Sequence, residues 1–530
     1  MSDEEKKPRN PGTVTRGGLG ALSGLLAACA ALAVAELVAA AVRPQAGPVV
    51  AVGGAAIDRT PIAVKDWAIR NFGTNDKLIL QLGILAVLAL FALALGVLAL
   101  RHRRAGAAGV LLFGAVGAAA ATSRPDSTSV TDALPSVLGA IVGAGLLYVL
   151  VGRLPAPPRD VPEGPGDGWD RRGFVIAATA AAASSAGAGV LGRVLRGSSG
   201  QEAVASRKNI DLPPPDSRAP AIPRGAQLRV AGVSSFLTPN SGFYRVDTAL
   251  VVPKVDATAW RLRVHGEGVT REKTLTFEDL LRRELIERDI TLTCVSNEVG
   301  GPYVGNARWI GVRLADLLEE CGVRPPSAGG PADQLVARSV DGMTIGSPVE
   351  DVMDGRDAML VVGMNGRLLP FDHGFPVRML VPGLYGYVSA CKWIEDIELT
   401  TFDAYDSYWV KRDWAREAPI KTQSRIDTPK PFARPKAGTV IVAGVAWAQH
   451  RGIDRVEVRV DDGPWQEATL AAEDSRDTWR QWSYAWQATK GGHTLTVRAT
   501  DRTGETQTEK RTRTVPDGAS GWHSVVVTVE

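Results

Sequence analysis

The stretch FDHGFPVRMLVPGLYGYVSACKW, residues 371–393, carries the most informative pattern in the chain. It places His373, Arg378 and Lys392 among glycine-rich turns. Cations and backbone N–H groups in such an arrangement suit an anionic ligand, above all one that bears a phosphate. The surrounding sequence, to about residue 425, mixes strand and helix patterns, so we expect a ligand-binding α+β domain here.

A second informative stretch, TLTCVSNEVGG, covers residues 291–301. Cys294 lies near the end of a predicted strand, 289–297, and polar and glycine residues follow it. A thiolate that is held rigidly at such a place can bind a soft metal. Taken alone, Cys294 also fits a buried structural cysteine. A third stretch, PNSGFYR at residues 239–245, adds hydrogen-bonding groups upstream of these strands.

Local signals predict several elements between these stretches. WRLRVHG, residues 260–266, is typical of a strand, and Thr276 begins a pattern typical of a capped helix. Residues 314–322 predict a short helix that ends at a glycine. Residues 358–370 predict a hairpin with Asn365-Gly366 at its turn.

The last part of the chain has a different pattern. A proline-rich break at residues 428–435 is followed by alternating polar and apolar segments that are joined by short turns. This pattern predicts an all-β sandwich of about 100 residues, a size typical of such domains. Residues 428–530 are therefore expected to form a separate domain.

The first third of the chain is dominated by Ala, Leu, Gly and Val. A helix needs about 20 apolar residues to cross a bilayer, and residues 18–195 contain about five such segments. The predicted spans are 18–42, 78–100, 105–122, 133–152 and 173–195. We therefore expect an N-terminal bundle of transmembrane helices.

The positive charges of the short loops predict the orientation of this bundle. Lys and Arg gather in the tail at residues 1–17, in the loop 101–104 and before the fifth span. Such residues favour the cytoplasmic side. The tail is therefore expected in the cytoplasm, and the soluble domains are expected outside the cell membrane.

Residues 170–175 begin the fifth span with Arg171-Arg172 and resemble a twin-arginine export signal. The alternative is that the two arginines only flank a helix on its cytoplasmic side. A proline-rich segment, residues 196–228, follows and predicts an extended linker.

Overall charge and cysteine content exclude some classes of function. The net charge of +3 is small, and no basic face with interleaved aromatic residues is evident, so nucleic-acid binding has no support. The chain has four cysteines, none of them in a CxxC pair, which gives no support to a zinc ribbon or a thioredoxin-like site.

Together, the three stretches around residues 240, 294 and 378 resemble the sulfite oxidase family of molybdenum-cofactor enzymes. The resemblance implies a molybdopterin-binding oxidoreductase domain at residues 229–427. It also implies an immunoglobulin-like C-terminal domain at residues 428–530. The implied reaction is oxygen-atom transfer to or from a small sulfur or nitrogen oxide.

The resemblance also implies roles for single residues. Cys294 would be the protein ligand of molybdenum, and Asn297, Glu298 and Tyr385 would join it at the reaction site. The residues that would hold the pterin and its phosphate are Asn240, Tyr244, Arg245, Ser339, His373, Arg378, Gly386, Tyr387 and Lys392.

Two departures from the family pattern leave the substrate open. Glu298 follows Asn297 where sulfite oxidases have an arginine, and Tyr385-Gly386 is similar to the bacterial branch that reduces methionine sulfoxide. No haem is expected in this chain, so the resemblance implies a separate electron-transfer partner. A homodimer is left open. The competing hypothesis is a cofactor-free membrane protein whose ectodomain serves binding or adhesion.

Overall fold

The computed structural model describes residues 13–61, 64, 67, 71–72, 76–124, 127, 129–154 and 171–530, without the side chains of a few of them, such as 190–199. The chain divides into two compact units. The first contains residues 1–202 and 248–252, and the second contains residues 203–247 and 253–530. Each unit is described by itself below.

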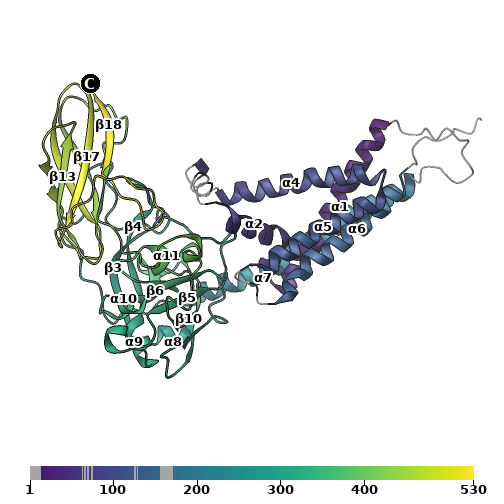
Figure 1. Cartoon of the computed structure of the whole chain (residues 1–530), viewed down its shortest axis with the longest axis horizontal. Helices are drawn as coiled ribbons and strands as arrows, with labels where there is room; N and C mark the ends of the chain where they lie inside the picture. Colours follow the sequence, from purple (N-terminus) through teal and green to yellow (C-terminus); the bar gives the residue numbers. More distant parts are fainter. Residues whose placement is uncertain are drawn as a thin grey trace, which may run out of the picture. The chain divides into compact units, whose positions relative to one another are not determined.

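The first unit is helical (Figure 1). Its longer helices are α1 (Thr13–Val42), α2 (Pro48–Arg59), α4 (Asp76–Ala99), α5 (Arg103–Thr122) and α6 (Leu134–Gly152), with 3-10 turns η1 (Pro44–Ala46) and η3 (Val130–Ala133). Among the described residues, four helical segments are long and apolar enough to cross a membrane: Thr15–Val42, Leu78–Ala99, Arg103–Thr122 and Val130–Gly152. They coincide with the first four predicted spans.

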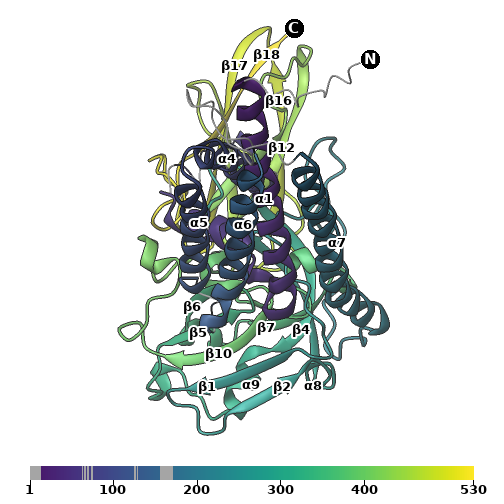
Figure 2. The same cartoon turned by 90° about the vertical axis from the view of Figure 1, so that its right-hand side faces the viewer.

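Small residues let these helices approach closely. A Cβ atom added at Gly24 of α1 would lie 1.9 Å from the carbonyl oxygen of Ala92 in α4. At Gly139 of α6, it would lie 2.5 Å from the carbonyl oxygen of Ala31 in α1. Figure 2 shows α1 and α6 side by side. Close backbone contact through glycine and alanine is typical of helices that pack in a bilayer.

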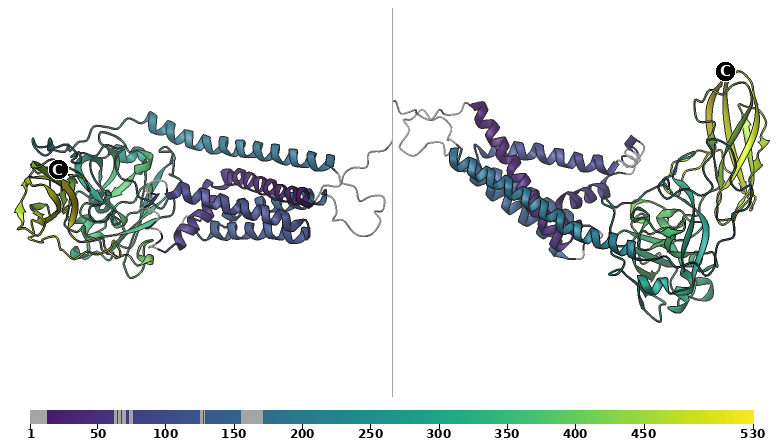
Figure 3. Two further views of the ribbon diagram at one scale, coloured as in Figure 1. Left: turned by 90° about the horizontal axis from the view of Figure 1, so that it is seen from above. Right: turned by 180° about the vertical axis from the view of Figure 1, so that it is seen from behind.

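Helix α7 (Arg171–Asn209) contains the fifth predicted span and is one long, unbroken helix (Figure 3). It continues past residue 195 into the segment that was predicted to be an extended linker. Residues 1–12 of the predicted tail, Asp170 of the export-like motif and several side chains of the fifth span lie outside the described residues. The fifth span and the export signal therefore stay predictions.

The central domain of the second unit, residues 253–422, contains two five-stranded sheets. One has the order β2 (Lys273–Thr276), β1 (Arg261–Gly266), β10 (Ile394–Thr400), β5 (Gln334–Ser339), β6 (Thr344–Pro348), with β1 and β10 parallel. The other has the order β3 (Leu285–Thr293), β4 (Val304–Arg313), β7 (Met359–Met364), β8 (Arg367–Leu368), and β9 (Arg378–Leu380) pairs with β7. Short helices connect them: α8 (Phe277–Leu281), α9 (Leu314–Glu320), η4 (Pro326–Ala328), α10 (Val349–Met353), η5 (Phe371–His373), α11 (Gly386–Ser389) and η6 (Val410–Arg412).

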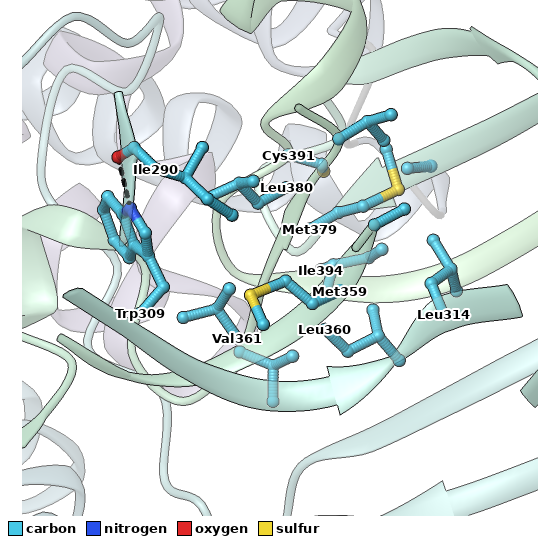
Figure 4. Close-up of a cluster of buried hydrophobic side chains, with 14 of the residues drawn as sticks. Ile290, Trp309, Leu314, Met359, Leu360, Val361, Met379, Leu380, Cys391 and Ile394 are labelled. Carbon is cyan, nitrogen blue, oxygen red and sulfur yellow. Dashed lines mark hydrogen bonds between the residues drawn. The ribbon is translucent and has the colours of Figure 1, made fainter. Parts of the chain in front are cut away.

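A continuous apolar core fills the central domain. Figure 4 shows Met359, Leu360 and Val361 of β7 next to Met379 and Leu380 of β9. These strands are buried at every position, as expected for strands covered on both faces. Trp309 of β4 lies in the same core, and its Nε1 donates a hydrogen bond to the carbonyl oxygen of Ile290 at 2.9 Å.

The C-terminal domain, residues 423–530, consists of two four-stranded antiparallel sheets. Their orders are β11 (Gln423–Thr428), β12 (Gly438–Trp447), β16 (Arg480–Ala488), β15 (Thr469–Leu470) and β14 (Gln466–Glu467), β13 (Ile453–Val460), β17 (Gly491–Asp501), β18 (His523–Val529). One apolar cluster joins residues of both sheets. The all-β sandwich is therefore confirmed, and its immunoglobulin-like character stays a prediction.

The C-terminal domain also makes hydrogen bonds to strand β3 of the central domain. Gln449 is fully buried, and its Nε2 donates to the carbonyl oxygen of Thr291 at 3.0 Å and to Oγ1 of Thr293 at 2.9 Å. The backbone N–H of Trp479 donates to Oγ1 of Thr291 at 2.7 Å. The backbone N–H of Thr291 in turn donates to the carbonyl oxygen of Asp477 at 2.9 Å. The end of β3 is thus held from both domains.

Candidate cofactor site

Cys294 lies one residue past the end of β3 rather than inside a longer strand. Its backbone N–H donates to the carbonyl oxygen of Tyr303 at 3.0 Å, and its thiol is buried and free. Burial raises the pKa of this thiol, whereas hydrogen bonds from Ser296 and the charge of Lys392 act in the opposite direction. A thiol in this environment becomes a thiolate when a metal ion binds it.

The loop after Cys294 folds back on it. The backbone N–H of Asn297 donates to the carbonyl oxygen of Cys294 at 3.0 Å, and Oδ1 of Asn297 accepts from the N–H of Tyr303 at 2.8 Å. Nδ2 of Asn297 is buried and has no partner among the described residues. Glu298 is partly exposed. A buried donor without a partner is costly in a folded protein, so this Nδ2 is available to an acceptor from a bound group or to a water molecule.

Arg378, at the start of β9, is a buried cation that lies opposite Lys392 in an isolated β-bridge. Its Nη1 donates to the carbonyl oxygen of His373 at 3.3 Å, and its guanidinium lies 5.2 Å from the ring centroid of Trp309. Nε has no hydrogen-bond partner, and the described residues place no carboxylate in ion-pair contact with it. Burial lowers the pKa of Arg378 to about 10. This is the environment expected for a cation that binds an anionic ligand.

Lys392 and Arg245, in contrast, contact carboxylates. Nζ of Lys392 lies 2.6 Å from Oδ2 of Asp247 and donates to the carbonyl oxygen of Asp372 at 3.1 Å. Arg245 lies 3.9 Å from Asp247 and 3.7 Å from Asp372, measured between side-chain nitrogen and oxygen. The predicted cation cluster therefore exists, and two aspartates that were not predicted lie within it.

His373, in η5, is neutral at pH 7, because burial and the charges of Arg378 and Lys392 lower its pKa to about 4. Its Nε2 lies 3.0 Å from the carbonyl oxygen of Asn240. A carbonyl only accepts, so Nε2 carries the hydrogen and Nδ1 is left as an acceptor. Oδ1 of Asn240 accepts from Nδ2 of Asn365 at 2.7 Å, which ties residues 239–245 to the hairpin.

Tyr244 stacks on Phe243 with ring centroids 5.1 Å apart. Burial, followed by the proximity of Cys294, raises the pKa of Tyr244, whereas Arg378 acts in the opposite direction. These effects place Tyr244, Cys294 and Arg378 in one electrostatic neighbourhood. The three predicted stretches around residues 240, 294 and 378 therefore do meet.

Other predicted residues lie at the edges of this neighbourhood. A Cβ atom at Gly386 would lie 3.8 Å from the carbonyl oxygen of Thr293, so the start of α11 adjoins the end of β3. The hydroxyl of Tyr385 accepts from the N–H of Lys421 at 3.4 Å, and that of Tyr387 donates to the carbonyl oxygen of Ala415 at 2.8 Å. Both hydroxyls thus bond to the segment that leads into the C-terminal domain.

Ser339 is buried at the end of β5. Its Oγ accepts from the N–H of Asp341 at 3.4 Å, and its backbone N–H donates to the carbonyl oxygen of Met343. These contacts belong to a tight turn next to Ile394 of β10. They give Ser339 a local structural role, and its place in cofactor binding stays a prediction.

The assembled residues fit a molybdenum–pterin cofactor. The described residues contain no group of three His, Cys, Asp or Glu side chains that could hold a metal ion by themselves. A metal bound to Cys294 would therefore draw its other ligands from a cofactor, and the sulfur ligand suits a soft centre. Arg378 and the unpartnered Nδ2 of Asn297 supply charge and a donor to an anionic group.

Asp247 and Trp309 are contacts of the site that sequence reasoning missed. Asp247 meets Lys392 across 145 positions of sequence, and Trp309 lies on a strand with no polar pattern. No local signal predicts either contact, because both arise only from the tertiary fold.

Comparison with known proteins supports this assignment. Residues 249–409 match the oxidoreductase molybdopterin binding domain, and residues 417–530 match the Mo-co oxidoreductase dimerisation domain. Mitochondrial sulfite oxidase of Rattus norvegicus is 31% identical over 292 residues, which cover 47% of this chain and 52% of that protein. Sulfite oxidase of Gallus gallus is 32% identical over 296 residues, which cover 48% of this chain and 63% of that protein.

Among solved structures, the sulfane dehydrogenase SoxCD from Paracoccus pantotrophus aligns with a TM-score of 0.48 and 24% identity, covering 56% of this chain and 84% of that chain. The chain spans about half of the length of the mammalian sulfite oxidases that it matches. The two matched domains and these relatives show that the chain belongs to the sulfite oxidase family of molybdopterin oxidoreductases.

Proposed function

We propose that this chain is a membrane-anchored oxidoreductase that transfers an oxygen atom to or from a small sulfur or nitrogen oxide with the help of a molybdenum cofactor. The observation that carries the proposal is the pair formed by Cys294, a free buried thiol, and Arg378, a buried cation that has no carboxylate contact among the described residues. The contacts of Arg378 with His373 and Trp309 offset only part of the cost of its burial.

The proposed roles follow from the contacts. Cys294 binds the metal, and Arg378, Lys392 and His373 hold the anionic and hydrogen-bonding parts of the pterin. When bound, the cofactor supplies two-electron oxygen-atom transfer, and the protein supplies orientation and electrostatics. Neutral His373 offers Nδ1 as an acceptor and adds no charge. Nδ2 of Asn297, which is buried three residues after Cys294, is a donor available to an oxygen atom beside Cys294.

The charges around Cys294 favour an uncharged oxide as substrate over a dianion. Lys392 and Arg245 contact Asp247 and Asp372, and Glu298 adds a further negative charge. A cofactor phosphate would use the charge of Arg378. Little positive charge then remains to attract sulfite, so we favour reduction of a sulfoxide or an N-oxide, with sulfite oxidation as the competing reaction.

We further propose that α1, α4, α5, α6 and the first part of α7 anchor the enzyme in the cell membrane. The four apolar segments support the anchor, and the loop arginines support an extracytoplasmic location of the soluble domains. Arg171-Arg172 would then direct export after the cofactor has been inserted. A separate cytochrome or quinone-linked membrane protein would exchange electrons with the site, and the family match of residues 417–530 supports a homodimer.

The decisive experiment uses the full chain, purified in detergent from a host that makes the cofactor. Molybdenum is measured by mass spectrometry, and we expect about one atom per chain, as for an enzyme with a single cofactor. Steady-state assays then compare sulfite oxidation with reduction of methionine sulfoxide and other S- and N-oxides. Protein without molybdenum would refute the proposal in favour of the cofactor-free binding protein, which the molybdopterin-domain match does not favour.

A further inference from the structure

The end of α7, residues 203–209, belongs to the second unit and packs on the central domain. Ala203 and Ser206 are buried, and Oγ of Ser206 accepts from the backbone N–H of Ala257 at 3.2 Å. This helix end therefore has a fixed place on the domain that carries the candidate cofactor site.

Arg207 extends from this helix end to the segment that leads into η5. Its Nε donates to the carbonyl oxygen of Leu369 at 2.8 Å, and its Nη2 donates to that of Leu368 at 2.8 Å. The guanidinium carbon also lies 6.0 Å from the ring centroid of Phe371 and 5.8 Å from that of Phe375. Burial lowers the pKa of Arg207, so these contacts hold a partly desolvated cation.

Residues 368–373 form a row of six consecutive carbonyl groups, and each accepts a hydrogen bond. Arg207 binds the first two, and backbone N–H groups of the turn bind that of Pro370. Nε1 of Trp393 donates to the carbonyl of Phe371 at 2.9 Å. Lys392 and Arg378 donate to those of Asp372 and His373. Three cations therefore hold this irregular segment, and two of them are candidate cofactor ligands.

We propose that Arg207 is a positioning residue for the cofactor site. The proposal rests on the proposed function, because the segment it holds carries His373 and leads directly into Arg378. Without Arg207, two carbonyls lose charged donors and the segment gains other conformations. The carbonyls of residues 372 and 373 then no longer hold Lys392 and Arg378 in the single arrangement that binds the cofactor. The cofactor therefore dissociates faster.

The test compares three variants of the full-length holoenzyme: Arg207→Ala, Arg207→Lys and the control Arg480→Ala. Arg480 is matched, because it is also half-buried and also donates Nε and a terminal nitrogen to two backbone carbonyls, those of Ala471 and Ile453 in the C-terminal domain. Molybdenum that remains on the protein is followed during dialysis. Hydrogen exchange of the amides at residues 371–379 is followed by mass spectrometry.

We expect Arg207→Ala to lose molybdenum about ten- to hundredfold faster than the wild type, as for the loss of one or two charge-assisted hydrogen bonds. Exchange at residues 371–379 should rise in the same variant. Lysine keeps the positive charge but has one amine in place of the two donor nitrogens that Arg207 uses. The rates of Arg207→Lys should therefore lie between those of the wild type and those of Arg207→Ala. Arg480→Ala should leave both the loss of molybdenum and this local exchange unchanged.

The proposal is overturned if Arg207→Ala loses molybdenum at the same rate as Arg480→Ala and also shows the same hydrogen exchange at residues 371–379. If Arg207→Ala does not fold, Arg207→Lys decides, and rates equal to the wild type overturn it. Wild-type protein that contains no molybdenum would instead refute the proposed function. Hydrogen exchange of the cofactor-free variants would then still show whether Arg207 orders residues 371–379.

Discussion

Replacing Arg378 by methionine is predicted to remove the cofactor and, at the same time, to stabilise the cofactor-free protein. A residue that only supports the fold would give the opposite change in stability. Arg378 is 5% exposed, and burial lowers its pKa to about 10. A fall of that size corresponds to a cost of about 3 kcal/mol for the charged form.

The full cost is present at pH 7, because the side chain is charged in both the folded and the unfolded protein. Two contacts offset part of it. The hydrogen bond to the carbonyl of His373 contributes about 1 kcal/mol, and the contact with the ring of Trp309 contributes about 1 kcal/mol. Methionine fits a similar volume, so Arg378→Met should raise the free energy of unfolding by about 1 kcal/mol.

The assay is urea unfolding of cofactor-free protein from a host that cannot make the cofactor, followed by tryptophan fluorescence. Arg308→Met is the matched control, because Arg308 makes hydrogen bonds of 2.8 and 2.6 Å to the buried carboxylate of Asp289. Removing one partner of a buried ion pair costs about 3–5 kcal/mol. The two variants should therefore change stability in opposite directions.

Molybdenum content is measured on the same variants after expression in a cofactor-competent host. Arg378→Met should contain almost none, whereas folded Arg308→Met should contain the wild-type amount. A loss of stability of more than about 2 kcal/mol in cofactor-free Arg378→Met would contradict the reasoning, because a loss of that size would mean that Arg378 supports the fold. Retention of molybdenum would contradict the assignment of Arg378 to the cofactor.

Three further predictions concern the same region. Cys294→Ala should lose molybdenum and all turnover and keep the circular dichroism spectrum of the wild type; a turnover rate close to that of the wild type would exclude Cys294 as the ligand. The pKa of His373 is about 4 in the folded protein and ordinarily 6.5. The unfolded chain therefore binds a proton first, and the free energy of unfolding falls as the pH drops from about 6.5 to about 4. His373→Gln keeps a donor for Asn240 and should flatten this loss by about 1.4 kcal/mol per pH unit, and an unchanged pH profile would argue against a neutral His373. Gln449→Met should lower the free energy of unfolding by about 2 kcal/mol and speed hydrogen exchange at the end of β3, and unchanged exchange there would show that Gln449 does not hold Thr293.

Local signals in the sequence were enough to predict elements whose cause is local. Asn365 and Gly366 both have positive φ, at 52° and 73°, as a tight hairpin between β7 and β8 requires. Thr276 and Asp279 form the reciprocal hydrogen bonds of a capping box. In each case two or three neighbouring residues define the geometry, so the pattern is visible without the fold.

Contacts between distant segments could not be predicted. Arg207 meets Leu368 across 161 positions, and Gln449 meets Thr293 across 156 positions. The extension of α7 to Asn209 has the same cause, because Ala203 and Ser206 gain burial only on the folded central domain. The proline-rich composition of residues 196–228 predicted a linker, and tertiary packing overrides such a preference.

The candidate site contains features that the sequence predicts and contacts that it does not. Residue types and glycine spacing predicted an anion site with the cations Arg378 and Lys392, and the family resemblance added Cys294 as the metal ligand. Which cation is paired was not predictable, because Asp247 contacts Lys392 and no described carboxylate contacts Arg378. That difference in pairing, rather than the presence of charge, is what distinguishes the candidate phosphate contact.

The hydrogen bonds from the C-terminal domain to β3 have a consequence for the order of biosynthesis. The strand that leads to Cys294 receives hydrogen bonds from Gln449 and Trp479, which are synthesised more than 150 residues later. Until these residues emerge from the ribosome and fold, the thiol that we propose as the metal ligand lacks its final support. We therefore expect maturation to follow a strict order, in which the whole soluble chain is translated and folded before the cofactor is inserted.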